Sequence, residues 1–441
     1  MQKKLLGLAV AGALAAPGLA LAQVEVYGFV NMSVGQVKYS EPTQHVYGAG
    51  ASTVGVGSVS KWDVQSHASN YGIRGRESLG GGLTAWFQIE QNAPIERSNN
   101  VAITPASRNS AVGIQGGFGN VFIGQWTTPW ADLDALWGVG TVGGLGPITS
   151  IIGRRETTGA APNPNCANGH TSPAPGTCDA VEAGGGVGHA FWRRVSQAAF
   201  YQSPVFGGLQ VKLAYQTNEG KANTTNGGTI SADPSMWSAS VQWAGMGGRA
   251  RVGAAFDSHK QFTSSAGTDD GFRVTGGWNF GFMDIGLAYE QMNYKTHQGD
   301  CEAEQMGIGV SIPIGNGFIR GSYAIAKDIK GAYGAGVVPA GGFGAANCTL
   351  IAGQTPSATL DTADNGAKTW NLGYEYRFSK RTTVGVGYAV IDNDQASVLT
   401  WTGLPPTQTG GGAGIAGQSV ANTPLPGSDP SMFFVNMVHR F

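Results

Sequence analysis

Charged side chains are scarce in this sequence of 441 residues: they make up 12% of it, against about 25% in an average soluble domain. An ordinary cytosolic enzyme of this length is therefore a poor fit. The formal net charge of -1 also gives no reason to expect nucleic acid or another polyanion as a partner. With 41% hydrophobic residues, the chain can still form a large buried or lipid-facing surface, which argues against global disorder.

Motifs of enzyme and cofactor sites are missing as well. The sequence has no G-x-S-x-G, H-E-x-x-H or Walker pattern, and its seven histidines are scattered. Residues 138–143 match G-x-G-x-x-G, but without the preceding strand and following helix that a dinucleotide site requires. We expect no cofactor and no metal. The enzyme alternative, a hydrolase, needs a Ser/His pair, and none can be identified in this sequence.

Long hydrophobic runs are absent after residue 22, which excludes a helical membrane protein because a spanning helix needs about 20 apolar residues. Before that point, Lys3 and Lys4 precede an apolar run, and Ala20-Leu21-Ala22 supplies small residues for cleavage. This order is typical of a secretory signal peptide. We expect residues 1–22 to be removed, leaving 23–441 as a single domain and shifting the net charge from -1 to -3.

Cysteines are few and even in number. In an exported chain, Cys166, Cys178, Cys301 and Cys348 are disulfide candidates, although four cysteines allow three pairings. His170 follows Cys166 closely, so zinc is the alternative, but no fourth ligand lies at a finger-like spacing.

Alternation with a period of two is the pattern that recurs. Apolar residues at 283, 285, 287 and 289 alternate with Asp284, Gly286, Ala288 and Glu290, and segments 209–216, 237–243, 306–312 and 383–390 follow the same rule. Such alternation is typical of strands with a different medium on each face.

Short and long connections alternate between these segments, which places all tight turns at one end of the strands. On this basis about sixteen strands are expected, starting near residues 24, 69, 82, 108, 120, 195, 208, 235, 249, 272, 283, 304, 317, 368, 382 and 431. An even strand number with short turns on one rim and long loops on the other is typical of a bacterial transmembrane barrel. The 71 glycines fit close strand approach, bends and turns.

The composition of the two faces distinguishes the barrel from its rivals. A soluble sandwich carries many Lys and Glu on its outer face, whereas the polar face here is rich in Gly, Ser, Thr, Asn and Gln. A closed barrel also satisfies every backbone hydrogen bond in lipid. The alternative outside transport is an exported β-rich adhesion or structural protein; a β-helix of that kind would show a fixed short repeat, and none is present.

Several segments resemble the trimeric general porins of Gram-negative bacteria, in particular those of betaproteobacteria. The resemblance rests on segments 24–30 (VEVYGFV), 69–85 (SNYGIRGRESLGGGLTA), 108–124, 191–204 and 367–393, and on the last strand, 433–441, which ends in Phe441. It covers both ends and most strands, whereas the loops match poorly. The resemblance implies an all-β, 16-stranded antiparallel transmembrane barrel with short periplasmic turns, long extracellular loops and a third loop folded inward.

That resemblance also implies a location and partners. The chain is expected in the outer membrane of a Gram-negative bacterium, as a homotrimer surrounded by lipid bilayer and lipopolysaccharide. Phe441 would be read by the machinery that inserts outer-membrane barrels. The function implied is a water-filled channel for passive diffusion of small hydrophilic solutes and ions, without catalysis.

Alternation sorts fifteen charged residues onto the inner wall, where they are solvated and tune selectivity. They are Glu25, Arg74, Arg76, Glu90, Lys212, Arg249, Arg251, Asp257, Arg273, Asp284, Glu290, Arg320, Glu375, Arg377 and Arg440. The family resemblance places residues 127–194 where the third loop narrows the channel, with Arg154, Arg155, Arg193 and Arg194 as its basic residues. Within it, Pro129 to Trp137 is expected to form one or two helical turns.

The hypothesis for the constriction is that Asp132 and Asp134 face Arg74 and Arg76 across its narrowest point. Related porins often carry Arg where this chain has Gln125, Phe200 and Val438, which leaves the ion preference open. The loop is also rich in tryptophan, so a channel specific for a sugar or a small organic acid is the alternative within transport.

Overall fold

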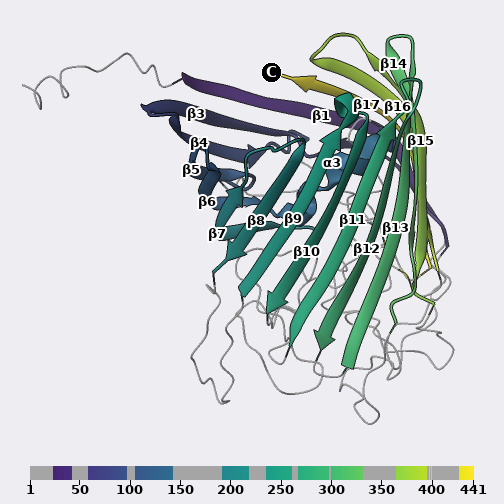
Figure 1. The fold of residues 1–441 in the computed structure, drawn as a ribbon. Coiled ribbons are helices and arrows are strands. Elements are labelled where there is room, and N and C mark those ends of the chain that lie inside the picture. Colours follow the sequence, from purple (N-terminus) through teal and green to yellow (C-terminus); the bar gives the residue numbers. More distant parts are fainter. Residues whose placement is uncertain are drawn as a thin grey trace, which may run out of the picture.

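The computed structural model describes residues 23–41, 58–96, 105–142, 191–217, 235–260, 267–296, 299–330, 364–394, 397, 399 and 427–441. Nearly all of them belong to one antiparallel sheet that curves into a barrel (Figure 1). Within this part of the chain, no helix has the length and apolar character needed to cross a membrane.

The strands follow one another around the barrel in chain order. They are β1 (Gln23–Tyr39), β2 (Val59–Ser66), β3 (Asn70–Gly80), β4 (Leu83–Asn92), β5 (Ser110–Gly116), β6 (Gly119–Thr127), β7 (Arg194–Gln202), β8 (Leu209–Gln216), β9 (Ser235–Gly245), β10 (Ala250–Lys260), β11 (Thr268–Asn279), β12 (Asp284–Thr296), β13 (Gly299–Ile314), β14 (Gly317–Ala326), β15 (Ala367–Arg377), β16 (Thr382–Asn393) and β17 (Pro430–Arg440).

Strand β1 closes the barrel. One edge of β1 pairs with β17, and its other edge pairs with β2 over residues 32–39 and with β3 over residues 23–29. Strands β2 and β3 thus occupy one position in the ring, and the closed barrel has sixteen positions, as the sequence predicted. The sheet closes on itself, so most backbone hydrogen bonds of its strands are satisfied within it. Among the described residues, β2 is paired in register with β1 alone.

A local break separates β2 from β3. Ala68 has φ 51°, and the Ser69 hydroxyl accepts a hydrogen bond from the Asn31 N–H at 2.9 Å and donates to the Asn31 carbonyl at 3.1 Å. The Ser69 side chain therefore supplies hydrogen bonds that the interrupted ladder would have made. The sequence pattern indicated β3 but missed β2, because Trp62 and Val64 are the only apolar residues that alternate on its outer face.

Strand starts agree with the expected ones to within five residues. Tight turns lie at one rim, and glycine permits them: Gly80, Gly81 and Gly82 all have positive φ. One inner-wall assignment was wrong, because Arg249 lies in the turn before β10 and not in the strand. Alternation fails there because the turn ends the regular strand.

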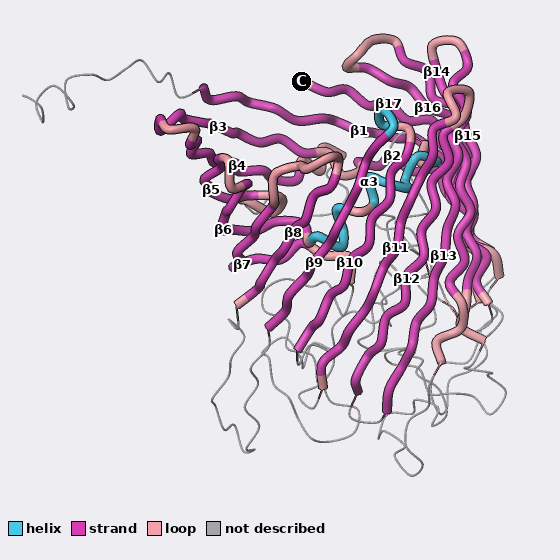
Figure 2. The backbone as a smooth tube through the Cα atoms, in the orientation of Figure 1, coloured by secondary structure: helices cyan, strands magenta, loops and turns pink. Residues whose placement is uncertain are grey.

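The outer face is apolar and exposed, as a lipid-facing surface must be. On β12, Leu287 is 55% exposed, whereas Glu290 on the opposite face is fully buried inside the barrel. The inner face is filled on one side by a short helical segment, which Figure 2 shows in cyan within the ring of strands.

Candidate pore constriction

An inward segment, residues 128–142, crosses the interior of the barrel. It contains α2 (Pro129–Asp132), α3 (Asp134–Trp137) and η1 (Gly138–Gly140). Thr128 caps α2 by accepting a hydrogen bond from the Ala131 N–H, and Pro129 occupies the first turn, where its missing N–H costs nothing. The helical turns expected from the sequence are therefore present.

The inward segment lies against the wall formed by β8 to β16. Helix α2, which directly follows β6, contacts β6, β8, β9 and β10. Helix α3 contacts β10, β11 and β12, and η1 contacts β12, β13 and β14. Val142 continues onto β15 and β16, next to Gly373 and Gly385. Within the described part of the chain, the segment makes no comparable contact with the wall formed by β1, β3, β4 and β5, which lies on the open side of the interior.

Glycines let the backbone of the segment approach the wall closely. A Cβ atom on Gly286 of β12 would lie 2.0 Å from the Trp137 carbonyl oxygen, and one on Gly140 would lie 2.1 Å from the Gly321 carbonyl oxygen. Real Cβ atoms do not approach other atoms so closely, so alanine at either position would displace the segment.

Two ion pairs fix the acidic residues of the segment. The Lys212 ammonium on β8 donates to Asp132 at 2.8 Å. The Arg273 guanidinium on β11 pairs with Asp134 and lies 3.5 Å from Glu290. Arg273 is fully buried, whereas the Lys212 side chain is 15% exposed, so the Arg273 pair is the stronger anchor.

Three arginines also hold carbonyl groups of the segment. Arg273 donates to Trp130 at 3.2 Å, Arg251 to Leu136 at 2.6 Å and Arg320 to Val139 at 2.9 Å. Arg251 and Arg320 are in turn paired with wall carboxylates, Asp284 at 2.6 Å and Glu375 at 3.7 Å. These three arginines are therefore engaged in holding the segment.

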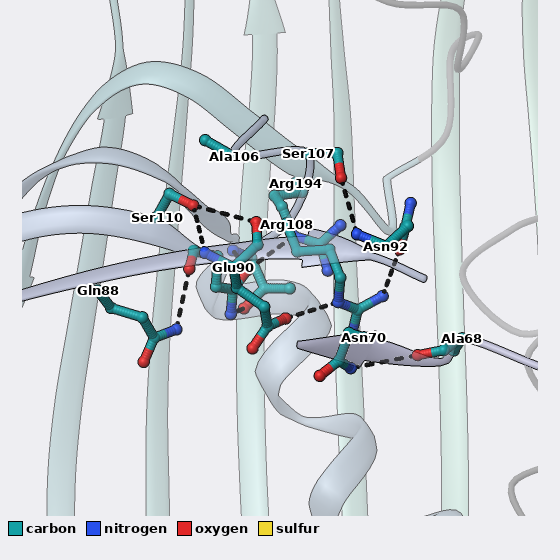
Figure 3. Close-up of polar contacts among 12 residues, drawn as sticks. Ala68, Asn70, Gln88, Glu90, Asn92, Ala106, Ser107, Arg108, Ser110 and Arg194 are labelled. Carbon is teal, nitrogen blue, oxygen red and sulfur yellow. Dashed lines mark hydrogen bonds and ion pairs between the residues drawn. The ribbon is translucent and has the colours of Figure 1, made fainter. Parts of the chain in front are cut away.

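The opposite wall carries a ladder of polar contacts on β1, β3 and β4, reaching Arg108 just before β5. Arg74 pairs with Glu25 at 2.9 Å and lies over the Tyr27 ring, 4.7 Å from its centroid. The Tyr27 hydroxyl donates to Glu90 at 3.0 Å, and Arg108 pairs with the same carboxylate at 2.6 Å. Figure 3 shows Arg108 between Glu90 and Asn92, with Arg194 close by.

Arg76 differs from its neighbours on this wall. Its side chain is exposed, and it makes no hydrogen bond or ion pair with another residue of the described part. Together with Arg74 and Arg108, it gives this wall three cations against the two carboxylates of Glu25 and Glu90. The open side of the pore is therefore weakly basic.

The predicted site residues lie in several different places. Glu25 and Arg74 are brought together, and Arg320 and Arg194 lie on the inner wall, where Arg194 donates to Asn109 at 2.7 Å. Asp132 and Asp134 are turned toward the wall on which the segment packs, and neither contacts Arg74 or Arg76 within the described residues. Arg193 is buried, and its carbonyl accepts from the Thr128 N–H at 3.1 Å, joining the two ends of the long connection.

Several predicted residues lie outside the described ranges. Arg154, Arg155, Cys166, Cys178 and Cys348 are among them. Cys301 lies on β13, where its backbone is paired with Tyr294 of β12. Phe441 extends the last strand: its N–H donates to the Gly28 carbonyl at 3.1 Å, and its side chain is 47% exposed.

The contacts of three residues were not predicted from the sequence. Lys212 and Arg273 were placed on the inner wall, but nothing in the sequence singled them out as partners of the segment. Arg108 was not placed at all, because it precedes the regular part of β5, where alternation no longer reports the facing. The one available signal for Arg108 was its place as a basic residue just before the strand β5.

Known proteins similar to this chain were found by sequence and by structure. A family model described as Gram-negative porin matches residues 7–396. Outer membrane porin protein 32 of Delftia acidovorans is 25% identical over 410 residues, which cover 90% of this chain and 92% of the relative. Major outer membrane protein P.IB of Neisseria gonorrhoeae is 33% identical over 135 residues, 31% of this chain and 35% of that protein.

Two solved structures show the same fold. The anion-selective porin from Comamonas acidovorans superposes with a TM-score of 0.60 at 20% identity, covering 95% of this chain and all of that one. OmpT of Vibrio cholerae, in a structure described as its trimer form, gives a TM-score of 0.53 at 12% identity, covering 95% and 99%.

Proposed function

Because the chain belongs to the Gram-negative porin family and forms a water-filled channel for small hydrophilic solutes in the outer membrane, we propose that its selectivity is set between the inward segment and the opposite wall. The observation that carries this proposal is the one-sided packing of residues 128–142 on β8 to β16. Solutes then pass along the wall of β1, β3, β4 and β5.

The charges on the two sides favour a modest preference for anions. Asp132 and Asp134 are each paired with a wall cation, which weakens their field across the pore. On the other side, Arg74 is paired with Glu25, but Arg76 is exposed and makes no ion pair within the described residues. The acidic residues thus form the weaker side of a transverse field, and the basic wall the stronger side.

Planar-bilayer recording in a KCl gradient tests the proposal. Arg74→Ala and Arg76→Ala are expected to shift the reversal potential toward cation preference, because each removes a positive charge from the wall. Arg381→Ala, at the exposed turn before β16, is the matched control and should leave it unchanged. An unchanged reversal potential and conductance in both test variants would exclude this wall as the selective element.

The short strands suggest the face that contacts other copies in a trimer. At about 3.4 Å per residue and a tilt of about 40°, the seven to nine residues of β5 to β8 rise only about 18 to 23 Å. The apolar band of such barrels is about 25 Å tall. Contact with neighbouring protomers would cover this low wall, and unheated detergent electrophoresis of the purified protein tests for the trimer.

Export and surroundings complete the proposal. Residues 1–22 are removed as a signal peptide, residues 23–441 form the barrel domain, and residues 127–194 form its constriction loop. The insertion machinery reads Phe441, and lipopolysaccharide surrounds the long-loop rim. The related proteins are channels, and we propose that this chain likewise catalyses no reaction and needs no cofactor. N-terminal sequencing of the mature protein tests the cleavage site.

A further inference from the structure

Four aromatic side chains form a continuous patch on the inner wall between β4 and β7. This aromatic row consists of Trp86, Phe122, Trp126 and Phe200. The Phe122 ring lies 5.3 Å from both Trp86 and Trp126, and the two tryptophan rings are 5.9 Å apart. Phe200 stacks on Phe122 at 4.8 Å with an interplanar angle of 6°.

The aromatic row faces the interior of the barrel and not the lipid. The outward residues of the same strands are Ile89, Val121 and Ile123, which are 46%, 46% and 59% exposed. Within the row, Phe122 and Phe200 are buried, whereas Trp86 and Trp126 are partly exposed. The two indole rings are therefore the part of the row that a passing solute meets.

The backbone of β5 lies beneath the aromatic row. Trp86 is paired in register with Gly113, and Gly113 with Phe122. A Cβ atom on Gly113 would lie 2.8 Å from the Trp86 ring, so the ring covers the backbone of β5 at that point. Larger residues at position 113 would lift the indole into the pore.

Polar groups border the row. The Trp86 indole N–H donates to the Asn120 side-chain oxygen at 2.8 Å, which fixes the ring. The Trp126 indole N–H finds no acceptor within the described residues. An amide and a free indole donor next to partly exposed rings suit a solute that has one flat apolar face and one polar edge.

A cation stands beside the exposed end of the row. Arg76 on β3 is directly opposite Trp86 on β4, and such pairs have Cβ atoms about 4.5 to 5.5 Å apart. The Arg76 side chain is exposed and makes no ion pair among the described residues, whereas Arg74 is held by Glu25. The Arg76 guanidinium is available to a carboxylate, which it binds with two parallel hydrogen bonds.

We propose that the aromatic row and Arg76 form a binding site for aromatic carboxylates passing through the channel. The ring of the solute stacks on Trp86 and Trp126, and its carboxylate pairs with Arg76. A neutral sugar would use the rings but not the cation, and an aliphatic acid would use the cation but not the rings. The proposal rests on the channel function proposed above, because the site lies on the solute path.

The test measures block of KCl current through single channels by three sodium salts. Benzoate has a flat ring and a carboxylate, cyclohexanecarboxylate has a bulky non-aromatic ring, and acetate has no ring. Benzoate is expected to halve the current at a concentration at least several-fold lower than the other two. Glucose, as the neutral probe, is expected to have no comparable effect.

Variants locate the effect in the row. Trp86→Leu and Trp126→Leu should each raise the half-blocking concentration of benzoate about two- to tenfold, the range expected for losing one aromatic contact. Arg76→Gln should weaken block by benzoate and acetate alike. The matched controls are Trp237→Leu, at a lipid-facing position that is 44% exposed, and Arg381→Gln. Benzoate should block both controls at the same concentration as the unmodified protein.

The outcomes separate the two proposals. If KCl current is normal but benzoate blocks no better than cyclohexanecarboxylate, or if glucose blocks as well as benzoate, the aromatic-acid site is wrong and the channel function stands. If the unmodified protein carries no current, the channel function itself fails. The salt series on the unmodified protein distinguishes these two cases even where a variant does not fold.

Discussion

Replacing Arg273 by methionine should release the inward segment from the wall. Arg273 is fully buried and contacts the segment twice, through the Asp134 carboxylate and the Trp130 carbonyl. Methionine keeps much of the volume of the side chain but removes its charge and its donors. It also removes the cation 3.5 Å from Glu290, which is buried as well.

The structure sets the size of the effect. Removing Arg273 breaks its pair with Glu290, in which both side chains are buried, and such a loss costs about 3 to 5 kcal/mol. The part of this cost that falls on the segment is smaller, because the Asp134 side chain is 27% exposed. At about 1.4 kcal/mol for each factor of ten, each 1.4 kcal/mol lost by the segment raises the population of its detached state about tenfold. The Lys212–Asp132 pair is partly exposed, and its loss should cost about 1 kcal/mol or less.

Single-channel recording and thermal unfolding in detergent measure the two consequences. Arg273→Met should raise the mean conductance and the current noise, because the detached segment no longer narrows the pore. It should also lower the melting temperature by several degrees. Lys212→Met is the matched control, since it removes the neighbouring anchor, and it should have a clearly smaller effect on both quantities.

Equal behaviour of the two variants would refute the reasoning. If Arg273→Met and Lys212→Met show the same conductance, noise and melting temperature, burial does not distinguish the anchors. The segment would then be held by its backbone packing against glycines and not by charge.

Three further predictions test other parts of the molecule. Glu90→Gln removes the negative charge that neutralises Arg108 and should shift the reversal potential in a KCl gradient toward anion preference, whereas an unchanged potential would show that Arg108 does not face the ion path. Gly286→Ala places a methyl group against the Trp137 carbonyl, so we expect a lower melting temperature and an altered conductance, and unaltered values would contradict the close packing. Burial, together with neighbouring carboxylates, raises the pKa of Asp394 at the long-loop rim, so its charge opposes folding at any pH above that pKa. Asp394→Asn should therefore raise the melting temperature at pH 7, and the gain should vanish as the pH falls toward the ordinary aspartate pKa of about 3.9; a gain that persists at pH 4 would refute this cause.

The barrel was predictable because the residue pattern within each strand shows which face is turned to the lipid and which to the interior. Apolar residues such as Leu287 on the outer face alternate with polar residues such as Glu290 on the inner face, because each strand has a different medium on each side. A short stretch of sequence is therefore enough to predict a strand and its facing. Where the pattern is weak, the prediction failed: β2 has too few apolar residues, and Arg249 lies beyond the end of regular pairing.

The partners of the inward segment could not be predicted in the same way. Asp134 and Arg273 are 139 residues apart in the chain, and alternation gives the face of a strand but not the height at which a side chain meets another element. The segment itself was recognisable, because Pro129 and the capping Thr128 are local signals. Its direction across β8 to β16 depends on where wall glycines leave room, which requires the register of distant strands.

The one-sided packing of the inward segment has a mechanical consequence. A barrel wall is a single layer of strands. Residues 128–142 pack on its inner face along β8 to β16 and stiffen that part of the wall. Among the described residues, the wall formed by β1 to β5 has no such support from the segment, and we expect it to be the softer side when lateral pressure in the membrane changes. Deformation of the channel therefore concentrates on the wall that carries Arg74 and Arg76, so the width of the pore and the field across it change together.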